Sequence, residues 1–527
     1  MLKTSRSTAR AYARRSPLGN PLKLTQSLLL PMAMCSAVGT VGLSTQAYAQ
    51  TAVMVEAGNQ SLRDDVQWLI DRGIIDLTTS TWPMPLSALE SALASRRVGN
   101  MSRGDQHAMA AVEAYVAQQR RTFVGVTAGL NTDRVPQLGF DATTRARAGV
   151  GAYGQASTEG FAGKVQVNGL ADTITNRQSN ANLEGSYAAA AALGQVLYVG
   201  QLAHFWGPGQ DGSLNWGNAA TAIPGIGLQR GTQTAFDNKW LSWIGPWGYD
   251  LFVGQMQHNT AVPQAKVLNM RAFARPVRGL EIGLSRFIQF GGKGRPNNLG
   301  AVWDAVTGNS NIDDPNAIGT DPSNELSGID ARYTFSLAGN PLTLYTQLTG
   351  EDEAGGLPSR YLGQVGAQFK HMVGTTRMQW YAEAADTTAR RLFGLQEGLR
   401  GYAYNHGSYT NGLYHDQLPI GHSIGGDGQL LSGGVTIVPD DYRYFSRYSA
   451  KILHAQVNRA NVPTNQAFDR SDKFYGGEFA YSWMFKPATF KAGVTVLRSV
   501  NGNTNDAFSL MLSMNVPLGG GSTMPAR

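Results

Sequence analysis

Hydrophobic residues between positions 60 and 120 recur at the spacing of helices. The first apolar face consists of Leu62, Val66, Leu69 and Ile70, and Gly73 follows where glycine commonly ends a helix. A second face follows Pro83 and Pro85, where Ser87 and Glu90 match a capping box. A third helix is expected from about residue 105 to 119. We therefore predict a small bundle of three helices in residues 50–120.

After Arg121 the hydrophobic spacing changes from 3.6 to 2. Apolar residues at the odd positions of 329–337 alternate with polar residues at the even positions, and 377–384, 475–485 and 508–516 repeat the alternation. Glycine-rich and polar spacers separate these segments. The pattern predicts strands with one apolar and one polar face over residues 121–518, followed by a polar tail, 519–527.

The number and length of these segments favour a transmembrane barrel over a soluble sandwich. About 14 to 18 segments of roughly ten residues can be counted, which is the length that crosses a bilayer at a tilt. Aromatic residues stand near segment ends, as in an interfacial girdle: Tyr249, Phe252, Tyr361, Trp380, Trp483 and Phe485. An open sheet edge in lipid would leave backbone groups unpaired, so the sheet should close.

The N-terminus has the three parts of a secretory signal peptide. A basic stretch is followed by an apolar stretch near 28–43 and then by Ala47-Tyr48-Ala49, which predicts a signal peptide over residues 1–49. Six of the 44 basic residues and none of the 37 acidic residues lie in this leader. The mature chain is then nearly neutral, so we expect no nucleic-acid partner.

The single cysteine, Cys35, also lies in the leader. The mature chain would have no disulfide and no cysteine ligand, and we expect neither a metal nor a cofactor. Met34 precedes Cys35 where a lipoprotein cleavage site favours a small residue, which argues against a lipid anchor. No mature stretch reaches about 18 apolar residues, the length of a membrane-spanning helix. These features alone leave an exported protein that is periplasmic, secreted or an outer-membrane barrel, and the strand pattern favours the cell outer membrane.

The stretch from Phe205 to Asn218, FWGPGQDGSLNWGN, is the strongest local motif. Gly207, Gly209 and Gly212 match the spacing of a dinucleotide-binding loop, but Pro208 interrupts the turn and no apolar helix follows. A phosphate cradle is therefore not expected. Glycine and proline would instead hold the backbone in a tight, rigid loop.

Two interpretations of this loop remain open from the residue types. Flat aromatic faces beside planar polar groups suit sugar rings, and the candidate polysaccharide-binding residues are Trp206, Asp211, Trp216, Asn218 and Arg230. The alternative is a structural hairpin with its aromatics in the membrane-interface girdle.

The run HFWGPGQDGSLNWGNAATAIPGIGLQR, residues 204–230, resembles the signature of the capsule assembly protein Wzi family. Residues 62–93 and 419–434 give further similarity. The resemblance implies a mainly β fold, a transmembrane antiparallel β-barrel of about 18 strands with a small N-terminal α-helical bundle on the periplasmic side. It also implies a lectin-like, non-catalytic protein that attaches capsular or related exopolysaccharide to the cell surface. The tail departs from a usual barrel end, which leaves the position of the last strand open.

The partners expected are this polysaccharide, outer-membrane lipid and other polysaccharide-export components, with the protein itself a monomer. Acidic capsules would suit further arginines, Arg443, Arg447 and Arg459, although lumen-facing arginines would satisfy a polar barrel interior equally well. His415 and His422 lack metalloprotease spacing, so an enzyme is not expected. The acidic residues of 313–325 and 352–353 are solvated loop charges or a weak calcium site. The alternative function is a substrate-specific porin.

Overall fold

The computed structural model of the protein describes residues 51–97, 99–135, 139–142, 144–298, 300, 302–303, 306, 323–351, 353–354, 357–358, 360–391, 398–503 and 506–519. The predicted signal peptide with Cys35 lies outside these residues, as do the acidic positions Asp313, Asp314, Asp321 and Asp352 and most of the polar tail.

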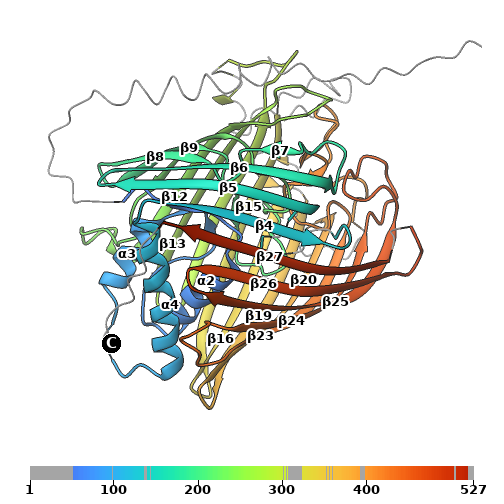
Figure 1. Ribbon diagram of the computed structural model, residues 1–527. Helices are drawn as coiled ribbons and strands as arrows, with labels where there is room; N and C mark the ends of the chain where they lie inside the picture. The colour runs from blue at the N-terminus through green and yellow to red at the C-terminus, as the bar shows by residue number, and fades with distance from the viewer. Residues whose placement is uncertain are drawn as a thin grey trace, which may run out of the picture. The chain divides into compact units, whose positions relative to one another are not determined.

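The described chain forms a closed antiparallel barrel, shown in Figure 1. Its strands are β4 (Phe123–Asn131), β5 (Ala146–Thr158), β6 (Phe161–Thr173), β7 (Ala181–Asn182), β8 (Tyr187–Ala192), β9 (Gln195–Gly200), β11 (Gly225–Arg230), β12 (Trp247–Gln255), β13 (Lys266–Val277), β14 (Leu280–Phe290), β15 (Ser323–Leu337), β16 (Asn340–Gly350), β19 (Tyr361–Val373), β20 (Thr376–Arg390), β23 (Gln429–Val438), β24 (Arg447–Val457), β25 (Asp472–Phe485), β26 (Ala488–Ser499) and β27 (Ala507–Leu518). Both β7 and β8 pair with β6, so they share one position in a barrel of 18 strands. The last strand, β27, closes the sheet on β4.

Side-chain burial along the strands is the reverse of that in a soluble sandwich. In β15 the charged residues Asp330 and Arg332 are 2% and 3% exposed, whereas Ile329 on the opposite face is 48% exposed. Polar side chains therefore fill the lumen, and apolar side chains form the outer surface that meets lipid. The predicted transmembrane barrel is confirmed, and the sandwich is excluded.

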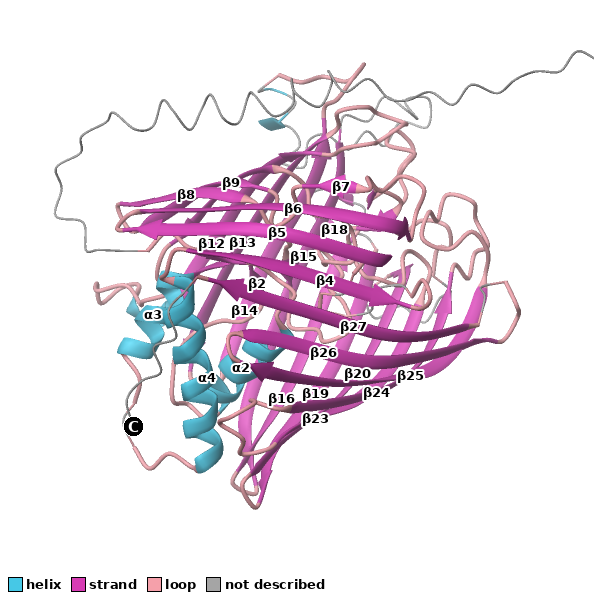
Figure 2. Ribbon diagram, in the orientation of Figure 1, coloured by secondary structure: helices cyan, strands magenta, loops and turns pink. Residues whose placement is uncertain are grey.

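The two ends of the barrel differ in the length of their connections. Two-residue turns at 193–194, 338–339 and 374–375 close one end, whereas loops such as 201–224 and 391–428 extend from the other. Short turns face the periplasm in outer-membrane barrels. The helices lie at this short-turn end, as Figure 2 shows, in agreement with the predicted periplasmic side.

The three predicted helices are confirmed as α2 (Gln60–Asp71), α3 (Leu86–Ala94) and α4 (Arg103–Gln119). Asn59 caps α2 by accepting from the Leu62 backbone N–H, and Gly73 follows its end with a φ of 70°. None of the helices in the described ranges is long and apolar enough to cross a membrane.

The capping box predicted at Ser87 and Glu90 is wrong. Ser87 lies inside α3, and its hydroxyl donates to the Gly231 carbonyl 2.6 Å away, just after the end of β11. The helix that does carry a capping box is α4, where Ser102 and Asp105 exchange hydrogen bonds with each other's backbone N–H. Tertiary contact with the barrel, rather than a local cap, takes the Ser87 hydroxyl.

The predicted girdle holds for some aromatics and fails for one. Trp380 and Phe485 point outward, and they are 44% and 64% exposed. Phe252 is 1% exposed because it lies on the lumen face of β12 and packs edge-on against Trp216.

The short strands form ladders of their own: β1 (Met54–Val55) with β3 (Met84–Pro85), β2 (Thr81–Trp82) with β10 (Phe205–Trp206), β17 (Glu353–Ala354) with β18 (Leu357–Pro358), and β21 (Tyr414–His415) with β22 (Leu418–Pro419).

Candidate functional site

Helix α2 lies inside the lumen and is attached to the wall by ion pairs. The Asp71 carboxylate is fully buried and lies 2.6 Å from both the Arg332 guanidinium and the Lys370 ammonium. Burial alone would raise the pKa of Asp71, but these two cations outweigh it and hold the pKa well below its usual value.

Two further carboxylates on α2 face the neighbouring part of the wall, on β20 and β24. Asp65 lies 2.7 Å from Arg377 and 3.0 Å from Arg447, and Asp64 lies 2.8 Å from Arg447. Arg447 was one of the arginines considered for acidic polysaccharide. Its guanidinium is instead occupied by α2, as expected of a lumen-facing arginine that satisfies the interior.

The long connection between β9 and β11, residues 201–224, turns into the lumen, and we call it the lumen loop. Its strand β10 pairs with β2, which joins the loop to the N-terminal segment. The backbone N–H of Trp206 donates to the backbone carbonyl of Trp216 over 2.8 Å, so the two tryptophans close a hairpin around the glycine-rich turn. The motif 205–218 therefore lies in the barrel interior.

Side chains of the barrel wall supply the hydrogen bonds that this irregular backbone lacks. The Glu383 carboxylate accepts from the backbone N–H groups of Gln210 and Asp211 over 2.6 and 2.9 Å. The Gln347 amide donates to the Trp206 carbonyl and accepts from the Leu214 N–H. Buried backbone groups need such partners, because an unpaired group costs about 1–3 kcal/mol.

Asp211 is the charged centre of the lumen loop. Its carboxylate lies 3.0 Å from the Lys451 ammonium and accepts from the hydroxyls of Ser432 and Tyr381 over 2.6 and 3.0 Å. Lys451 also lies 3.1 Å from Glu478. The partners of Asp211 come from β20, β23 and β24, so one side chain joins the loop to three strands, and Lys451 extends the contact to β25.

The aromatic residues of the motif pack against one another. Trp216 stacks on His204 at 3.8 Å with the rings 5° from parallel, and Trp206 contacts Trp216 edge-on at 4.9 Å. Trp206 is 0% and Trp216 is 4% exposed. Burial lowers the pKa of His204 to about 3, so this imidazole stays neutral.

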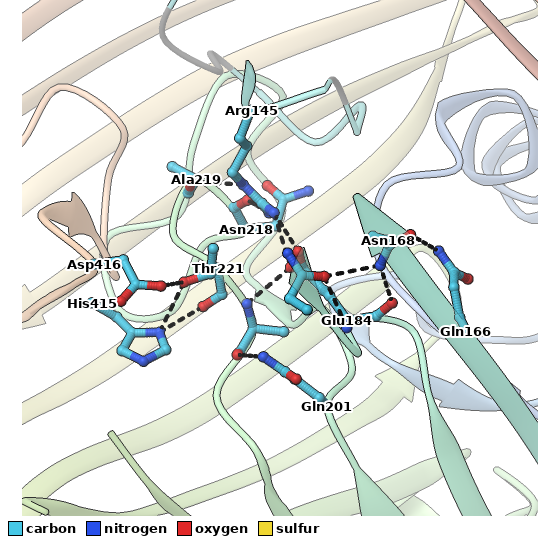
Figure 3. A network of polar contacts seen from close by, with 12 residues as sticks. Arg145, Gln166, Asn168, Glu184, Gln201, Asn218, Ala219, Thr221, His415 and Asp416 are labelled. Carbon is cyan, nitrogen blue, oxygen red and sulfur yellow. Dashed lines mark hydrogen bonds and ion pairs between the residues drawn. The ribbon is translucent and has the colours of Figure 1, made fainter. Parts of the chain in front are cut away.

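Figure 3 shows how the C-terminal part of the lumen loop is attached near the long-loop end. The Arg145 guanidinium donates to both carboxylate oxygens of Glu184 at 2.9 Å and to the Asn218 carbonyl at 2.8 Å. The Asn218 amide donates to the Phe140 carbonyl. The Thr221 hydroxyl donates to Asp416 over 2.6 Å, which links the loop to a hairpin in the loop 391–428.

The motif glycines allow close packing of the lumen loop. A Cβ on Gly209 would lie 2.2 Å from the Gly212 carbonyl oxygen, and one on Gly212 would lie 2.5 Å from the His422 ring. Gly207 has a φ of 144°, which few other residues adopt. The tight, rigid loop expected from these glycines is what the structure has.

Arg230 is separated from the other four candidate residues. It shares its face of β11 with the exposed Ile226, whereas the intervening Gln229 points inward. Its guanidinium stacks on the Trp247 ring at 4.2 Å and donates to the Thr234 carbonyl at the short-turn end.

The structure thus brings together Trp206, Asp211, Trp216 and Asn218, each at most 4% exposed, but not Arg230. The alternative that placed the two tryptophans in the membrane-interface girdle is wrong, because their side chains face the barrel interior. Sugar contact by the five residues stays a prediction. The wall residues Glu383, Gln347 and Lys451 were missed, although Glu383 stands on the polar face of the 377–384 alternation and could have been flagged.

Comparison with known proteins agrees with this arrangement. The family model described as capsule assembly protein Wzi matches residues 118–508. The chain belongs to the Wzi family. A Klebsiella pneumoniae relative, an uncharacterized 55.8 kDa protein in the cps region, is 34% identical over 443 residues, which is 84% of each chain. The solved structure of Escherichia coli Wzi, described as an outer membrane, carbohydrate-binding β-barrel involved in group 1 capsule assembly, has a TM-score of 0.77 and 31% identity over 88% of this chain and 99% of that chain.

In this member of the Wzi family, α2 and the lumen loop leave part of the lumen unfilled. A cavity of about 160 Å³ lies between them and the wall formed by β19, β20, β23 to β27 and β4. Lysine, carboxylate, amide and hydroxyl groups line it. The interior therefore combines an anchored plug with a polar cavity.

Proposed function

We propose that the protein binds exported capsular or related extracellular polysaccharide and attaches it to the cell surface, without catalysing a reaction. Membership of the Wzi family supports this function, together with the described carbohydrate binding of Escherichia coli Wzi. A signal peptide cleaved after Ala49 and insertion as a monomer complete the proposal. N-terminal sequencing of the mature protein should therefore begin at Gln50.

The plugged lumen is the observation that favours attachment over transport. The ion pairs of Asp64, Asp65 and Asp71 hold α2 across the short-turn end, and Glu383 and Gln347 hold the lumen loop at the centre. A porin needs an open, water-filled constriction instead. The purified protein should therefore carry no steady current in a planar bilayer, and large steady conductance would favour the porin.

The long-loop end is the surface that a polymer outside the cell can reach. Trp303, which lies between β14 and β15 in the sequence, is 66% exposed, and Arg459 follows the long-loop end of β24. Arg443 lies instead in the connection between β23 and β24, at the short-turn end with Arg230. Many weak contacts along a repeating polymer add by multivalency, so no deep surface pocket is needed.

Retention of polysaccharide by the immobilised protein tests the proposed surface. Trp303→Ala and Arg459→Ala should each weaken retention, while Arg230→Ala should leave it unchanged because Arg230 faces away from the cell exterior. If Arg230→Ala loses retention while the other two variants keep it, the result would support direct contact between the motif and the polysaccharide. Trp206→Ala should weaken retention only together with thermal stability, since its side chain is buried.

A further inference from the structure

Several of the wall residues that face the lumen cavity are small, which leaves it space. The inward positions of β24, β26 and β27 next to the cavity include Ser449, Gly493, Thr495 and Ser509. Larger side chains at these alternating positions would reach α2 and the lumen loop. The cavity of about 160 Å³ is well above the 10–15 Å³ or so that one water needs, and a void of about 150 Å³ admits a six-membered ring.

Three amide groups on the cavity lining have buried atoms without a hydrogen-bond partner among the described residues. They are Oε1 of Gln368, Nε2 of Gln379 and Nε2 of Gln210. Gln368 and Gln379 are only 5% and 8% exposed. Native proteins rarely leave buried amide atoms unpaired, so an occupant that both donates and accepts hydrogen bonds is expected here.

The charges on the lining are already compensated within the protein. Lys370 pairs with Asp71, Lys451 pairs with Asp211, and the Lys491 ammonium pairs with Asp141. Asp64 pairs with an arginine of the wall in the same way. A charged occupant would have to break one of these pairs, whereas a neutral one would not. Unpaired amide atoms beside paired charges therefore favour a neutral polyhydroxylated ligand.

We propose that this cavity is a binding site for one neutral pyranose ring. The ring hydroxyls would donate to Gln368 Oε1 and accept from Gln379 Nε2 and Gln210 Nε2. The site rests on the proposed function, because the sugar would be a residue of the attached polysaccharide or an oligosaccharide derived from it. It lies apart from the stacked Trp206 and Trp216, which have no exposed face to offer.

Calorimetric titration of the full-length mature protein with glucose, galactose, mannose and their neutral disaccharides tests the site. The micelles should be lauryl dimethylamine oxide, because maltoside and glucoside detergents carry competing sugar headgroups. At least one sugar should bind saturably. The variants Gln379→Leu, which removes an amide, and Ser449→Leu, which fills the cavity, should each weaken it about tenfold, the loss expected for one hydrogen-bonded contact.

Gln289→Leu is the matched control, because Gln289 is a buried wall amide outside the cavity that accepts from Asn324. It should leave the affinity unchanged. Heat-dependent migration in electrophoresis checks that each variant is folded. Absence of sugar binding in a protein that still retains polysaccharide overturns the cavity site alone, as does binding that Gln379→Leu and Ser449→Leu both leave unchanged. If the unaltered protein does not retain polysaccharide, the proposed function itself is overturned.

Discussion

Helix α2 and the lumen loop both fill the barrel, but they are held there in different ways. The backbone of α2 satisfies its own hydrogen bonds, so the wall meets it with charged side chains such as Arg332 and Lys370. The lumen loop is irregular, so the wall meets it with groups that bind backbone N–H and carbonyl groups, such as Glu383 and Gln347.

This difference explains the chemistry of the lumen wall. Strand positions opposite a helix need a cation for each carboxylate, whereas positions opposite a loop need planar groups that can donate and accept. Gln364 follows the second rule by donating to the Gly212 carbonyl. Arg63 of α2 joins the two regions, because its guanidinium donates to the Gly209 carbonyl at 2.8 Å. Breaking each type of contact should therefore have a different result.

The largest effect is expected for Asp71→Asn. The substitution leaves two buried cations without their shared carboxylate, and breaking a buried ion pair in this way costs about 3–5 kcal/mol. The helix itself should persist while its attachment to the wall fails. The free energy of unfolding in urea and protease cleavage near residues 72–80 measure the two parts. Glu113→Gln, at an exposed pair with Arg96, is the control and should cost less than about 1 kcal/mol.

Glu383→Gln should have an intermediate effect that is confined to the lumen loop. One acceptor oxygen and the negative charge are lost opposite two backbone N–H groups, and a hydrogen bond to a charged group contributes about 1.5–3 kcal/mol. Transient current should appear in a planar bilayer as the loop loosens, with α2 still attached. Glu478→Gln, which removes only a partner of Lys451, should remain closed. Equal currents from both variants would show that the backbone contacts are not what holds the loop.

The smallest effect is a dependence on pH at the long-loop end of the lumen loop. His258 Nδ1 lies 2.8 Å from Asp416, which also accepts from Thr221. The hydrogen bond to Asp416 raises the pKa of His258 above 6.5. Burial would raise the pKa of Asp416, but the same hydrogen bond opposes burial, and the pKa of Asp416 stays below 3.8. The pair should stabilise the contact between residues 256–265 and the lumen loop most between pH 3.8 and pH 6.5. Its contribution is lost as pH rises through the pKa of His258 and as pH falls through that of Asp416.

Hydrogen exchange of residues 256–265 at pH 6 and pH 8 should reveal this dependence. His258 is 43% exposed, so solvent limits the effect to less than about 1 kcal/mol. Exchange should be slower at pH 6 than at pH 8, relative to His258→Gln at each pH. This reference removes the separate effect of His204 and His422. Burial lowers the pKa of both imidazoles, so their protonation in acid destabilises the folded protein. The idea fails if the pH dependence of exchange is the same in the unaltered protein and in His258→Gln.

The elements of this protein follow from local sequence periodicity. Spacings of 3.6 and 2 located the three helices and the membrane-spanning strands, because each residue's face is set by helix and strand geometry alone. The errors have a common origin in distant contacts. Ser87 matched a local cap, but a carbonyl 144 residues away takes its hydroxyl, and Phe252 matched the girdle although it packs against Trp216.

The sequence by itself determined a barrel with an N-terminal helical part and a rigid glycine-rich loop, since these depend on periodicity, on turn residues and on motif resemblance. Only the tertiary structure decided that the loop 201–224 enters the lumen. Whether Trp206 and Trp216 point outward or inward depends on partners from strands more than 100 residues later, Gln347 and Glu383 among them. No local pattern encodes that meeting, because the backbone groups of the loop are satisfied only after the barrel has closed around them.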